Sequence, residues 1–285
     1  MIRPEQIFYQ GEPGAYSQLA AWSVFPGSKP EGLPAFADVF DRLATVKGNV
    51  AAVLPIENSI YGSVHPVLDL LQTNPFPIVG EYKLRIQHCL LAHPSTPVSS
   101  IREVYSHPQA LGQCESFFRQ NPQMKPVPWP DTAGAARYLA DHPELTTTGA
   151  IASEQAGLEY KLAVLQKNIE SFDHNFTRFV VVTPQPEPVP DANKTSIWFE
   201  AKDLPGSLYN CLGCFASREI NLIKIENRPV WGKAWKQIFY LDITGGLHQP
   251  AIREAIEELH AFTESVHILG SYREDQSEKG HVSGL

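Results

Sequence analysis

The chain has 285 residues, of which 43% are hydrophobic and 19% charged, and its formal net charge is −8. This composition is typical of a globular protein and too apolar for a disordered one. A chain of this length favours two or three structural units over one. The acidic balance argues against nucleic acid as a partner, because such binders neutralise phosphates with clustered Lys and Arg. A small anionic ligand stays possible, because a pocket needs only local hydrogen-bond donors.

No targeting or membrane segment is evident. No apolar run approaches the roughly 18 residues of a transmembrane helix, so we expect no membrane partner. Residues 1–10 have neither the basic and apolar regions of a secretory signal nor the Arg/Ser-rich character of a transit segment. We therefore expect a cytoplasmic protein, and a plastid location only if a transit peptide has been removed.

The four cysteines are Cys89, Cys114, Cys211 and Cys214. We expect reduced thiols, because a chain of this size and setting does not depend on disulfides. Cys211 and Cys214 form a C-x-x-C motif, which suits a redox pair or half of a zinc site. No second such motif completes a metal set, so we favour two small apolar residues one turn apart on a helix. No metal is predicted.

Apolar strands alternate with helices along the first 183 residues. The predicted strands span residues 7–10, 50–55, 104–106, 149–152 and 176–182. The predicted helices span residues 17–25, 64–71, 110–119, 132–140 and 154–160. This alternation predicts an α/β fold with mainly parallel sheets. Polar clusters follow the strands, where α/β folds bind ligands.

A proline-rich segment then separates two parts of the chain. Proline occupies every second position from Pro184 to Pro190, which excludes a helix and a paired strand. We expect residues 184–193 to form an extended, semi-rigid spacer. At the other end of the chain, the polar residues 274–285 are expected to be disordered.

The segment after the spacer has a different order of elements. Strands are predicted at residues 196–200, 220–228, 237–244 and 266–269, and helices at residues 208–217 and 250–260. This β-α-β-β-α-β order is that of a ferredoxin-like fold. Asp203 or a neighbour is expected to cap the first of these helices.

Two turns carry candidate ligand contacts. Asn58 and Ser59 follow a buried strand and precede Gly62, which suits a ligand site and a structural turn equally. The turn at residues 11–17 has two glycines, which let backbone N–H groups approach a carboxylate closely. It does not match the dinucleotide fingerprint G-x-G-x-x-G.

Two further segments carry polar residues with simpler interpretations. His107 suits a base or a donor, but a hydrogen-bonded loop histidine is favoured for a lone His. His107 and Cys114 do not form a nucleophile pair, because no third group orients them. In the last strand before the spacer, alternation places Thr177 and Phe179 on one face and Arg178 on the other. The pattern alone favours a structural role for Thr177.

Eight segments together resemble one family, the prephenate dehydratases and the related arogenate dehydratases. Among them are G-E-P-G-A-Y-S, L-P-I-E-N-S-I-Y-G-S-V-H, S-H-P-Q-A-L-G-Q-C, D-T-A-G-A-A and N-F-T-R-F. After the spacer come D-L-P-G-S-L, I-N-L and K-I-E-N-R-P. The segments occupy residues 11–17, 54–65, 106–114, 131–136, 175–179, 203–208, 220–222 and 224–229. No single segment is decisive, but their order and spacing from Gly11 to about Tyr272 are specific.

The resemblance implies an arrangement of domains. Residues 1–183 would form a catalytic domain with two lobes, built like type II periplasmic binding proteins. Lobe one would comprise about residues 1–80 and 165–183, and lobe two about residues 81–164. After the spacer at 184–193, residues 194–273 would form a ferredoxin-like ACT regulatory domain, followed by the tail at 274–285. ACT domains of this family imply a homodimer or homotetramer.

The resemblance also implies a reaction. Prephenate loses carbon dioxide and water to give phenylpyruvate, and because aromatisation drives this step no cofactor is needed. Thr177 would act at the leaving hydroxyl. A threonine is a poor acid by itself, so we expect it to share a hydrogen bond with a polar partner. Ten positions would line the substrate pocket: Ala15, Tyr16, Ser17, Asn58, Ser59, Gly62, Ser106, Gln113, Thr132 and Ala133.

In the ACT domain the resemblance implies a site for L-phenylalanine as feedback inhibitor. Its residues would be Leu204, Gly206, Ser207, Leu208, Asn221, Glu226 and Asn227. Without a ligand, residues 203–206 are also an ordinary helix start. Ser207 and Asn227 stand where the family commonly has Ala and Ser, which predicts weaker phenylalanine binding or another effector.

Two alternatives stay open. Several matching strings are similar to those of plant-type enzymes that use arogenate, which carries an ammonium group where prephenate has a keto group. The missing transit segment favours prephenate. Outside the enzyme class, a non-catalytic amino-acid sensor would keep the same folds, but Thr177, Asn58 and Gln113 are all present, which disfavours it.

Overall fold

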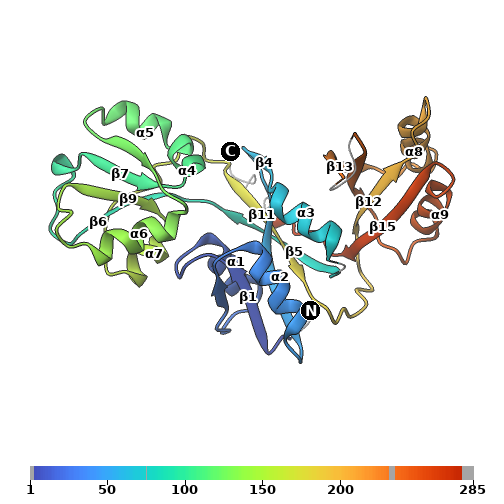
Figure 1. The fold of residues 1–285 in the computed structure, drawn as a ribbon, viewed down its shortest axis with the longest axis horizontal. Coiled ribbons are helices and arrows are strands. Elements are labelled where there is room, and N and C mark those ends of the chain that lie inside the picture. The colour runs from blue at the N-terminus through green and yellow to red at the C-terminus, as the bar shows by residue number, and fades with distance from the viewer. Residues whose placement is uncertain (1–2, 75, 231–234, 278–285) are drawn as a thin grey trace. The chain divides into compact units, whose positions relative to one another are not determined.

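The computed structural model describes residues 3–74, 76–230 and 235–277 (Figure 1). The chain divides into two compact units, each with its own internal packing. The larger unit comprises residues 4–68 and 83–179, and the smaller contains residues 69–82 together with the chain from residue 180 onward. Within the described ranges, no helix has both the length and the apolar character needed to cross a membrane.

The first sheet is built largely from the N-terminal third of the chain. Its elements are β1 (Gln6–Gln10), α1 (Tyr16–Val24), β2 (Glu31–Leu33), α2 (Phe36–Thr45), β3 (Val50–Asn58), β4 (Gly62–Ser63), α3 (His65–Thr73), β5 (Ile78–Arg85) and β11 (Phe176–Val182). The strand order is β2-β1-β3-β11-β5, and β4 pairs with β3. β1 is parallel to both β2 and β3, and the unbroken apolar start of β3 is fully buried, as in a sheet covered on both faces.

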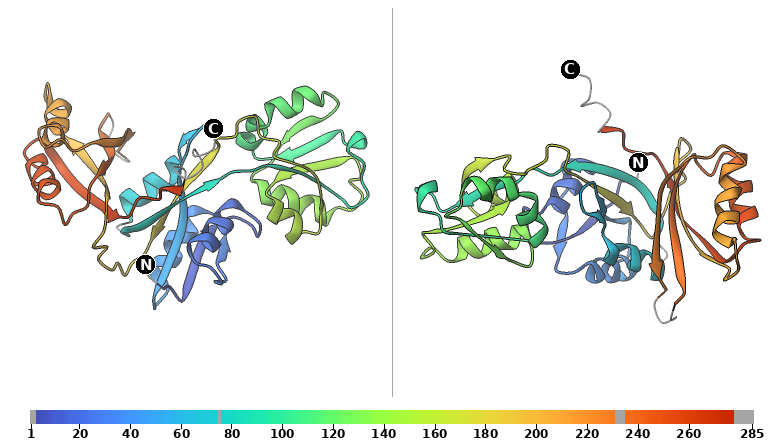
Figure 2. Two further views of the ribbon diagram at one scale, coloured as in Figure 1. Left: turned by 180° about the vertical axis from the view of Figure 1, so that it is seen from behind. Right: turned by 90° about the horizontal axis from the view of Figure 1, so that it is seen from above.

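The second sheet is formed by the middle of the chain. Its elements are β6 (Cys89–Ala92), the 3₁₀ turn η1 (Val98–Ser100), β7 (Glu103–Ser106), α4 (Pro108–Gln113), α5 (Glu115–Gln120), β8 (Lys125–Pro128), α6 (Thr132–Asp141), β9 (Thr148–Ala152), α7 (Glu154–Glu159) and β10 (Ala163–Lys167). The strand order is β10-β6-β9-β7-β8. Helices α4 and α5 pack into one core of this sheet, and α6 and α7 into another, on its two faces (Figures 1 and 2).

The prediction of mainly parallel sheets needs correction. β7 is parallel to β8 and β9, but β6 runs antiparallel to both of its neighbours, β9 and β10. Neither β6 nor β10 was predicted as a strand from the sequence, and these two contribute the antiparallel pairings, so the fold is mixed α/β.

The prediction of one helix over residues 110–119 was wrong. α4 ends and α5 begins around Cys114, whose backbone lies at φ −101° and ψ 23°. Cys114 is buried in the core under these helices, where its small thiol fills the corner between them. The change of direction lets Ala110, Leu111 and Phe117 all reach the same core.

The third sheet follows the spacer. Its elements are β12 (Lys194–Ala201), α8 (Ser207–Ala216), β13 (Leu222–Pro229), β14 (Gln237–Thr244), α9 (Pro250–Leu259) and β15 (Thr263–Tyr272), which confirms the predicted β-α-β-β-α-β order. The antiparallel strands run in the order β13-β14-β12-β15. Both helices cover the same face of this sheet around a core that includes Phe199, Phe215 and Leu241 (Figures 1 and 2).

The predicted cap of α8 was wrong. The residue before the helix is Gly206, at φ 82°, and no side chain caps the first turn. The Asp203 carboxylate instead lies 3.4 Å from the Lys236 Nζ atom. The left-handed backbone at Gly206 directs the chain into the helix, and this conformation favours glycine.

The spacer and the cysteines agree with the sequence. Residues 184–193 contain neither helix nor strand. Cys211 and Cys214 both lie buried on α8, one turn apart, and their thiols are free. Burial raises the pKa of Cys211 to about 11, which opposes the thiolate that redox or metal chemistry requires.

The predicted tail is ordered at its beginning. The Glu274 N–H donates to Asn193 Oδ1 at 2.6 Å, and the Asp275 N–H donates to Glu81 Oε1 at 3.1 Å. Residues 278–285, the remainder of the predicted disordered tail, lie outside the described residues. Disorder of residues 274–277 is therefore the wrong prediction, because acceptors on β5 and before β12 bind their backbone.

Candidate active site

Thr177 and Asn58 meet across two neighbouring strands of the first sheet. Asn58 is the last residue of β3, and Thr177 is the second residue of β11. The Asn58 Nδ2 group donates to Thr177 Oγ1 at 3.0 Å, which confirms that Thr177 shares a hydrogen bond with a polar partner. Because the Thr177 oxygen accepts this bond, its own hydroxyl proton remains available to donate to a ligand.

The whole Asn58 amide is used inside the protein. Its Oδ1 atom accepts the backbone N–H groups of Ile60 and Tyr61, both at 3.0 Å, which builds the turn into β4. Its Nδ2 group also approaches the Asn175 Oδ1 atom at 2.9 Å and the Phe176 carbonyl at 3.1 Å. Asn58 is therefore a turn residue that also positions Thr177.

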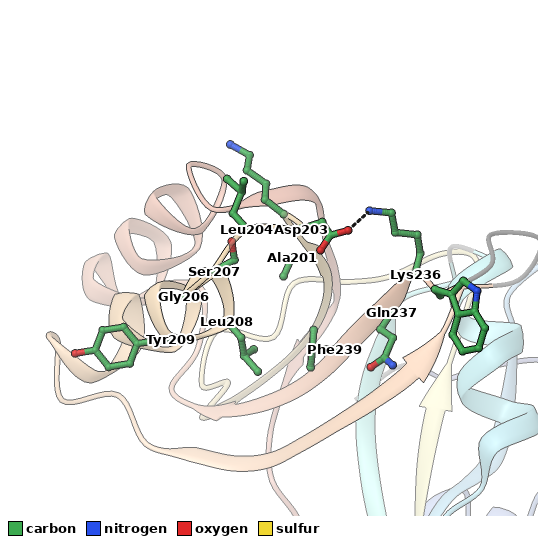
Figure 3. A pocket seen from close by; sticks show the side chains of 12 residues that line it. Ala201, Asp203, Leu204, Gly206, Ser207, Leu208, Tyr209, Lys236, Gln237 and Phe239 are labelled. Carbon is green, nitrogen blue, oxygen red and sulfur yellow. Dashed lines mark hydrogen bonds and ion pairs between the residues drawn. The ribbon is translucent and has the colours of Figure 1, made fainter.

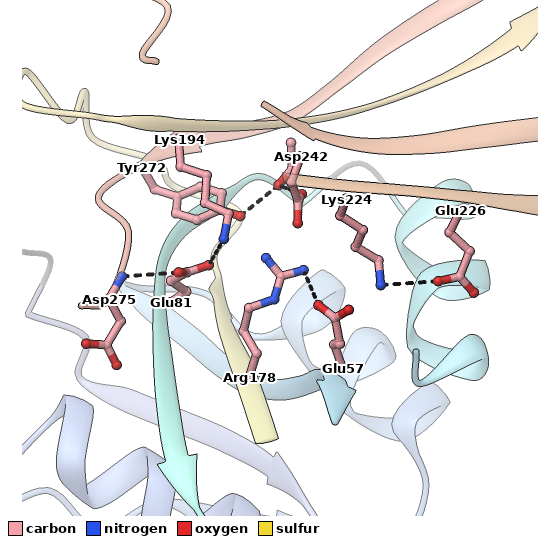
Figure 4. A network of polar contacts seen from close by, with 10 residues as sticks. Glu57, Glu81, Arg178, Lys194, Lys224, Glu226, Asp242, Tyr272 and Asp275 are labelled. Carbon is pink, nitrogen blue, oxygen red and sulfur yellow. Dashed lines mark hydrogen bonds and ion pairs between the residues drawn. The ribbon is translucent and has the colours of Figure 1, made fainter. Parts of the chain in front are cut away.

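Glu57 and Arg178, the neighbours of Asn58 and Thr177, also pair across β3 and β11, on the opposite face of the sheet. Arg178 Nη2 lies 3.2 Å from Glu57 Oε2, and the arginine side chain is almost completely buried (Figure 4). The pairs Glu57–Arg178 and Asn58–Thr177 thus alternate along the two strands, as the predicted faces of β11 require. Ser59 closes the same corner, because its hydroxyl donates to the His174 carbonyl and accepts the Phe176 N–H, each at 2.9 Å.

A second polar cluster surrounds His88, a residue that the sequence did not single out. The Tyr16 hydroxyl lies 2.9 Å from His88 Nδ1 and 2.8 Å from the Gln87 carbonyl. The other ring nitrogen, His88 Nε2, lies 2.6 Å from Gln113 Oε1. Burial lowers the pKa of His88 and raises that of Tyr16, so both are neutral at pH 7. The available signal was a histidine directly before a buried apolar strand.

The two clusters are adjacent. The Ile86 N–H donates to the Asn175 carbonyl at 2.7 Å, two residues from His88 on one side and two from Thr177 on the other. The Tyr61 hydroxyl also packs so closely on Gly112 that a Cβ atom added there would collide with it. These contacts join the segments that carry the two clusters, and all four residues belong to the larger unit.

Two helix starts contribute hydroxyl groups. Ser17 lies in the first turn of α1, and Thr132 is the first residue of α6. Within the described part of the chain neither hydroxyl has a hydrogen-bond partner, and neither is sealed from solvent. Ala15 packs against the core that contains Ala133, which brings the two helix starts together. Because the Ala133 methyl group is in that core, only its backbone can meet a ligand.

Two residues that were predicted to line the substrate pocket, Ser106 and Gly62, have contacts that indicate structural roles. Ser106 is completely buried and its hydroxyl donates to the Ile151 carbonyl at 2.6 Å. Gly62 lies in the β3–β4 turn at φ 77°.

His107 Nδ1 accepts the Gln109 N–H at 3.2 Å and caps α4, which confirms the interpretation of His107 as a hydrogen-bonded loop histidine. Among the described residues, no cluster of His, Cys, Asp or Glu is arranged to hold a metal ion.

A groove of about 310 Å³ lies at the start of α8 (Figure 3). Four of the predicted effector residues line it, namely Leu204, Gly206, Ser207 and Leu208. The sequence missed several other lining residues: Tyr209, Trp235, Lys236, Gln237 and Phe239.

The other three predicted effector residues do not line this groove. The Asn227 amide donates to Gln237 Oε1 at 2.7 Å, so it reaches the groove only through that neighbour. Glu226 pairs with Lys224 Nζ at 3.2 Å (Figure 4). Asn221 is exposed, and its carbonyl accepts the Thr244 N–H.

Comparison with solved structures defines the class of protein. The prephenate dehydratase from Arthrobacter aurescens, solved in complex with L-Phe, superimposes with a TM-score of 0.85 at 28% identity, covering 94% of this chain and 90% of that one. GqqA, described as a novel type of quorum quenching acylase, superimposes with a TM-score of 0.87 at 31% identity, covering 96% of this chain and 100% of that one. The fold is thus the mixed α/β fold of prephenate dehydratase structures.

Sequence comparison gives the family. The model of the prephenate dehydratase family matches residues 7–187. The arogenate dehydratase/prephenate dehydratase 2 of Arabidopsis thaliana, a chloroplastic protein, is 37% identical over 282 residues, which cover 95% of this chain and 73% of that protein. The chain belongs to the prephenate dehydratase family.

Proposed function

We propose that this protein converts prephenate to phenylpyruvate by decarboxylating dehydration, as a step in the biosynthesis of L-phenylalanine. Family membership supports the reaction. The observation that carries the proposal is the hydrogen bond from Asn58 to Thr177, because it leaves the Thr177 hydroxyl proton free for the departing group.

The chemistry needs a donor at the leaving hydroxyl and no redox step. The bond between the ring and its carboxylate breaks, and its electron pair completes the aromatic ring as the C–O bond to the hydroxyl breaks. The departing oxygen takes up a proton and leaves as water, while the carboxylate leaves as carbon dioxide. The Thr177 hydroxyl donates to that oxygen, and the Asn58 N–H stabilises the charge that develops on Thr177 Oγ1. A cofactor has no role in this scheme.

The predicted substrate-binding residues divide by what their polar groups do. Ser17, Gln113 and Thr132 have side-chain donors that are open to a ligand, and Ala15 and Ala133 offer backbone groups. Asn58, Ser59 and Ser106 act by holding the backbone and Thr177, and Gly62 serves the turn. Tyr16 acts through His88. Neutral donors suit a dianion that must lose one carboxylate, because a fixed cation would stabilise the starting charge.

The domain arrangement is part of the proposal. The first and second sheets would be the two lobes of a catalytic domain over residues 1–183, similar to type II periplasmic binding proteins. Residues 194–273 would be an ACT domain, through which the chain forms a homodimer or homotetramer. The helices covering each sheet and the β-α-β-β-α-β order support this arrangement.

L-Phenylalanine would inhibit the enzyme by binding the groove at the start of α8. The relative from Arthrobacter aurescens was solved with L-Phe, which supports this ligand. The backbone N–H groups that follow Gly206 suit the amino-acid carboxylate. Leu208 and Phe239 offer apolar surface to the ring.

Arogenate is the second candidate substrate, because the Arabidopsis relative is named for both activities. A paired assay separates the two. Purified protein receives prephenate or arogenate, and phenylpyruvate and phenylalanine are quantified with and without added L-phenylalanine. We expect phenylpyruvate from prephenate, suppressed by L-phenylalanine. Faster formation of phenylalanine from arogenate would reassign the substrate, and no product from either would favour the sensor.

A further inference from the structure

The turn at residues 11–17 follows β1 in the chain, but its middle is bound to the second sheet. The Gly14 carbonyl accepts a hydrogen bond from the Ser153 hydroxyl at 2.6 Å, and Ser153 directly follows β9. Ala15, the next residue of the turn, packs against the core that α6 and α7 share with this sheet. The turn therefore joins the two sheets of the larger unit.

The directions of the hydrogen bonds at Ser153 are unambiguous. A carbonyl oxygen only accepts and a backbone N–H only donates, so the Ser153 hydroxyl gives its one proton to Gly14 and accepts the Ala156 N–H at 3.0 Å. Ser153 is 2% exposed, which keeps water from competing for these bonds. The Gly14 N–H in turn donates to Gln18 Oε1 at 2.7 Å. Both polar backbone groups of Gly14 are therefore held inside the protein.

The turn also lies in direct contact with the backbone of α7. A Cβ atom added to Gly14 would lie 2.5 Å from the Cα atom and 2.8 Å from the Cβ atom of Ala156, which is completely buried. A helix backbone does not move aside as the end of a flexible side chain does. Gly14 also lies at φ 84°, where glycine is favoured. Glycine at this position thus permits the close approach that the Ser153 bond needs.

This contact fixes groups that belong to the proposed substrate site. Ala15 and Ser17 come from the turn and the start of α1, whereas Thr132 and Ala133 begin α6 on the second sheet. One substrate molecule can bind both pairs only if the distance between them is constant, because a displacement of about 1 Å is enough to lose a hydrogen bond. Ser153 is buried and both of its bonds are used, so it acts on this distance without touching the ligand.

We propose that Ser153 is a positioning residue for substrate binding. By holding the Gly14 carbonyl, its hydroxyl keeps the groups of the turn at residues 11–17 at a fixed distance from the start of α6. The proposal rests on the proposed function and deepens it, because it adds a residue that none of the family motifs contains.

The first test needs no substrate. Hydrogen exchange, followed by mass spectrometry, is measured for peptides that cover residues 11–18 in wild type, Ser153→Ala and Ser153→Thr. Ser153→Ala removes the donor, so we expect these peptides to exchange several-fold faster. Ser153→Thr keeps a hydroxyl group and should restore most of the protection, and peptides of the third sheet serve as the internal reference. Wild-type exchange at residues 11–18 in Ser153→Ala would overturn the proposal.

Steady-state kinetics separate positioning from a loss of folded protein. A smaller folded fraction lowers the apparent kcat and leaves KM unchanged, whereas a displaced binding group raises KM. We expect Ser153→Ala to raise KM for prephenate about fivefold, the typical effect of one hydrogen bond, with a smaller change in kcat. A lower apparent kcat at an unchanged KM would assign Ser153 a purely structural role and refute the positioning.

Two glycine variants separate the contact with the turn from the cap of α7, which Ser153 also provides. Gly14→Ala pushes the turn away from α7 and leaves Ser153 in place as the cap. Gly27→Ala is the matched control, because Gly27 has a similar φ of 80° and open space for a Cβ atom. We expect Gly14→Ala to raise KM at least as much as Ser153→Ala does, and Gly27→Ala to keep the wild-type KM. Equal KM values for the two glycine variants would contradict the role of the contact.

A failure of the proposed function gives a different result. Wild-type protein that converts only arogenate would move the same KM comparison to that substrate. Wild-type protein that converts neither substrate would refute the reaction and with it the role in substrate binding, and the exchange data would still show whether Ser153 holds the turn.

Discussion

The polar region around Thr177 and the groove at the start of α8 are built in opposite ways. Around Thr177, the side chains of Asn58, His88 and Gln113 are held by short hydrogen bonds in buried or half-buried positions. At the groove, Leu204 is 65% exposed, Tyr209 is 80% exposed, and the Asp203–Lys236 pair spans 3.4 Å in solvent (Figure 3). Catalysis benefits from donors fixed in advance, whereas an exposed groove gains its order from what binds there.

The largest expected effect is on turnover. Thr177→Ala removes the hydroxyl that we propose donates to the leaving group, so we expect kcat to fall about 10²- to 10⁴-fold with a smaller change in KM. Thr177→Ser keeps the hydroxyl and serves as the matched control. Steady-state kinetics on prephenate measure both, and an unchanged kcat in Thr177→Ala would remove Thr177 from the mechanism.

The contrast between buried and exposed polar groups is tested by comparing how much the loss of a buried and of an exposed ion pair lowers the free energy of unfolding. The Lys194–Glu81 pair spans 2.9 Å, with side chains 2% and 0% exposed (Figure 4). Lys194→Met leaves the Glu81 charge buried, so we expect it to lower the free energy of unfolding by about 3–5 kcal/mol. Lys236→Met breaks the exposed pair with Asp203 and should change it by less than about 1 kcal/mol. Similar losses in urea titrations of the two variants would refute the contrast.

The role of Asn58 is tested by exchanging its donor for an acceptor. Asn58→Asp keeps the oxygen that accepts the Ile60 and Tyr61 N–H groups but has no amino group for Thr177 Oγ1. Thr177 would then donate its proton to the carboxylate instead of the substrate, so we expect kcat to fall about 10²-fold. Retained thermal stability would separate this loss from damage to the turn, and an unchanged kcat would contradict the positioning of Thr177.

The groove is tested at its glycine. Gly206→Ala places a side chain at φ 82°, so we expect about 1 kcal/mol lower stability and inhibition that needs several-fold more L-phenylalanine. Gly213→Ala is the control, because this position lies inside α8 with open space for a Cβ atom, and alanine there should stabilise the helix. Equal inhibition curves for the two variants would move the effector site elsewhere.

The smallest effect is on the pH dependence of stability. Burial lowers the pKa of His88, so below the unfolded value of about 6.5 the unfolded chain binds a proton that the folded chain does not. The stability that neutral His88 contributes is therefore complete above that pH and is lost as the pH falls towards the folded pKa. His107 and His267 shift in the same direction, so the difference between wild type and His88→Gln isolates His88. Parallel stability curves for the two proteins between pH 7 and 5 would contradict this.

Local patterns predicted most elements, and the reasons for the failures are physical. The strands and helices of the third sheet were found because apolar residues recur in them at the spacing of a strand or a helix. α2 was missed although Val39, Phe40 and Leu43 lie buried on one side of it, because its polar residues dilute a short pattern. The corner at Cys114 was missed because the apolar run continues through it, and only the shape of the core breaks the helix.

The sequence by itself determined the order of elements after the spacer, the spacer itself and the family, and its motifs proposed Thr177 for the reaction. These follow from periodicity, proline spacing and motifs that lie close together in the chain. Only the tertiary structure decided which polar groups meet. His88 and Gln113 are 25 positions apart, Asn58 and Thr177 are 119 apart, and each pair is joined because separate elements bring the two side chains together. Hydrogen bonding depends on distance and direction in space, which neighbouring residues in the chain do not encode.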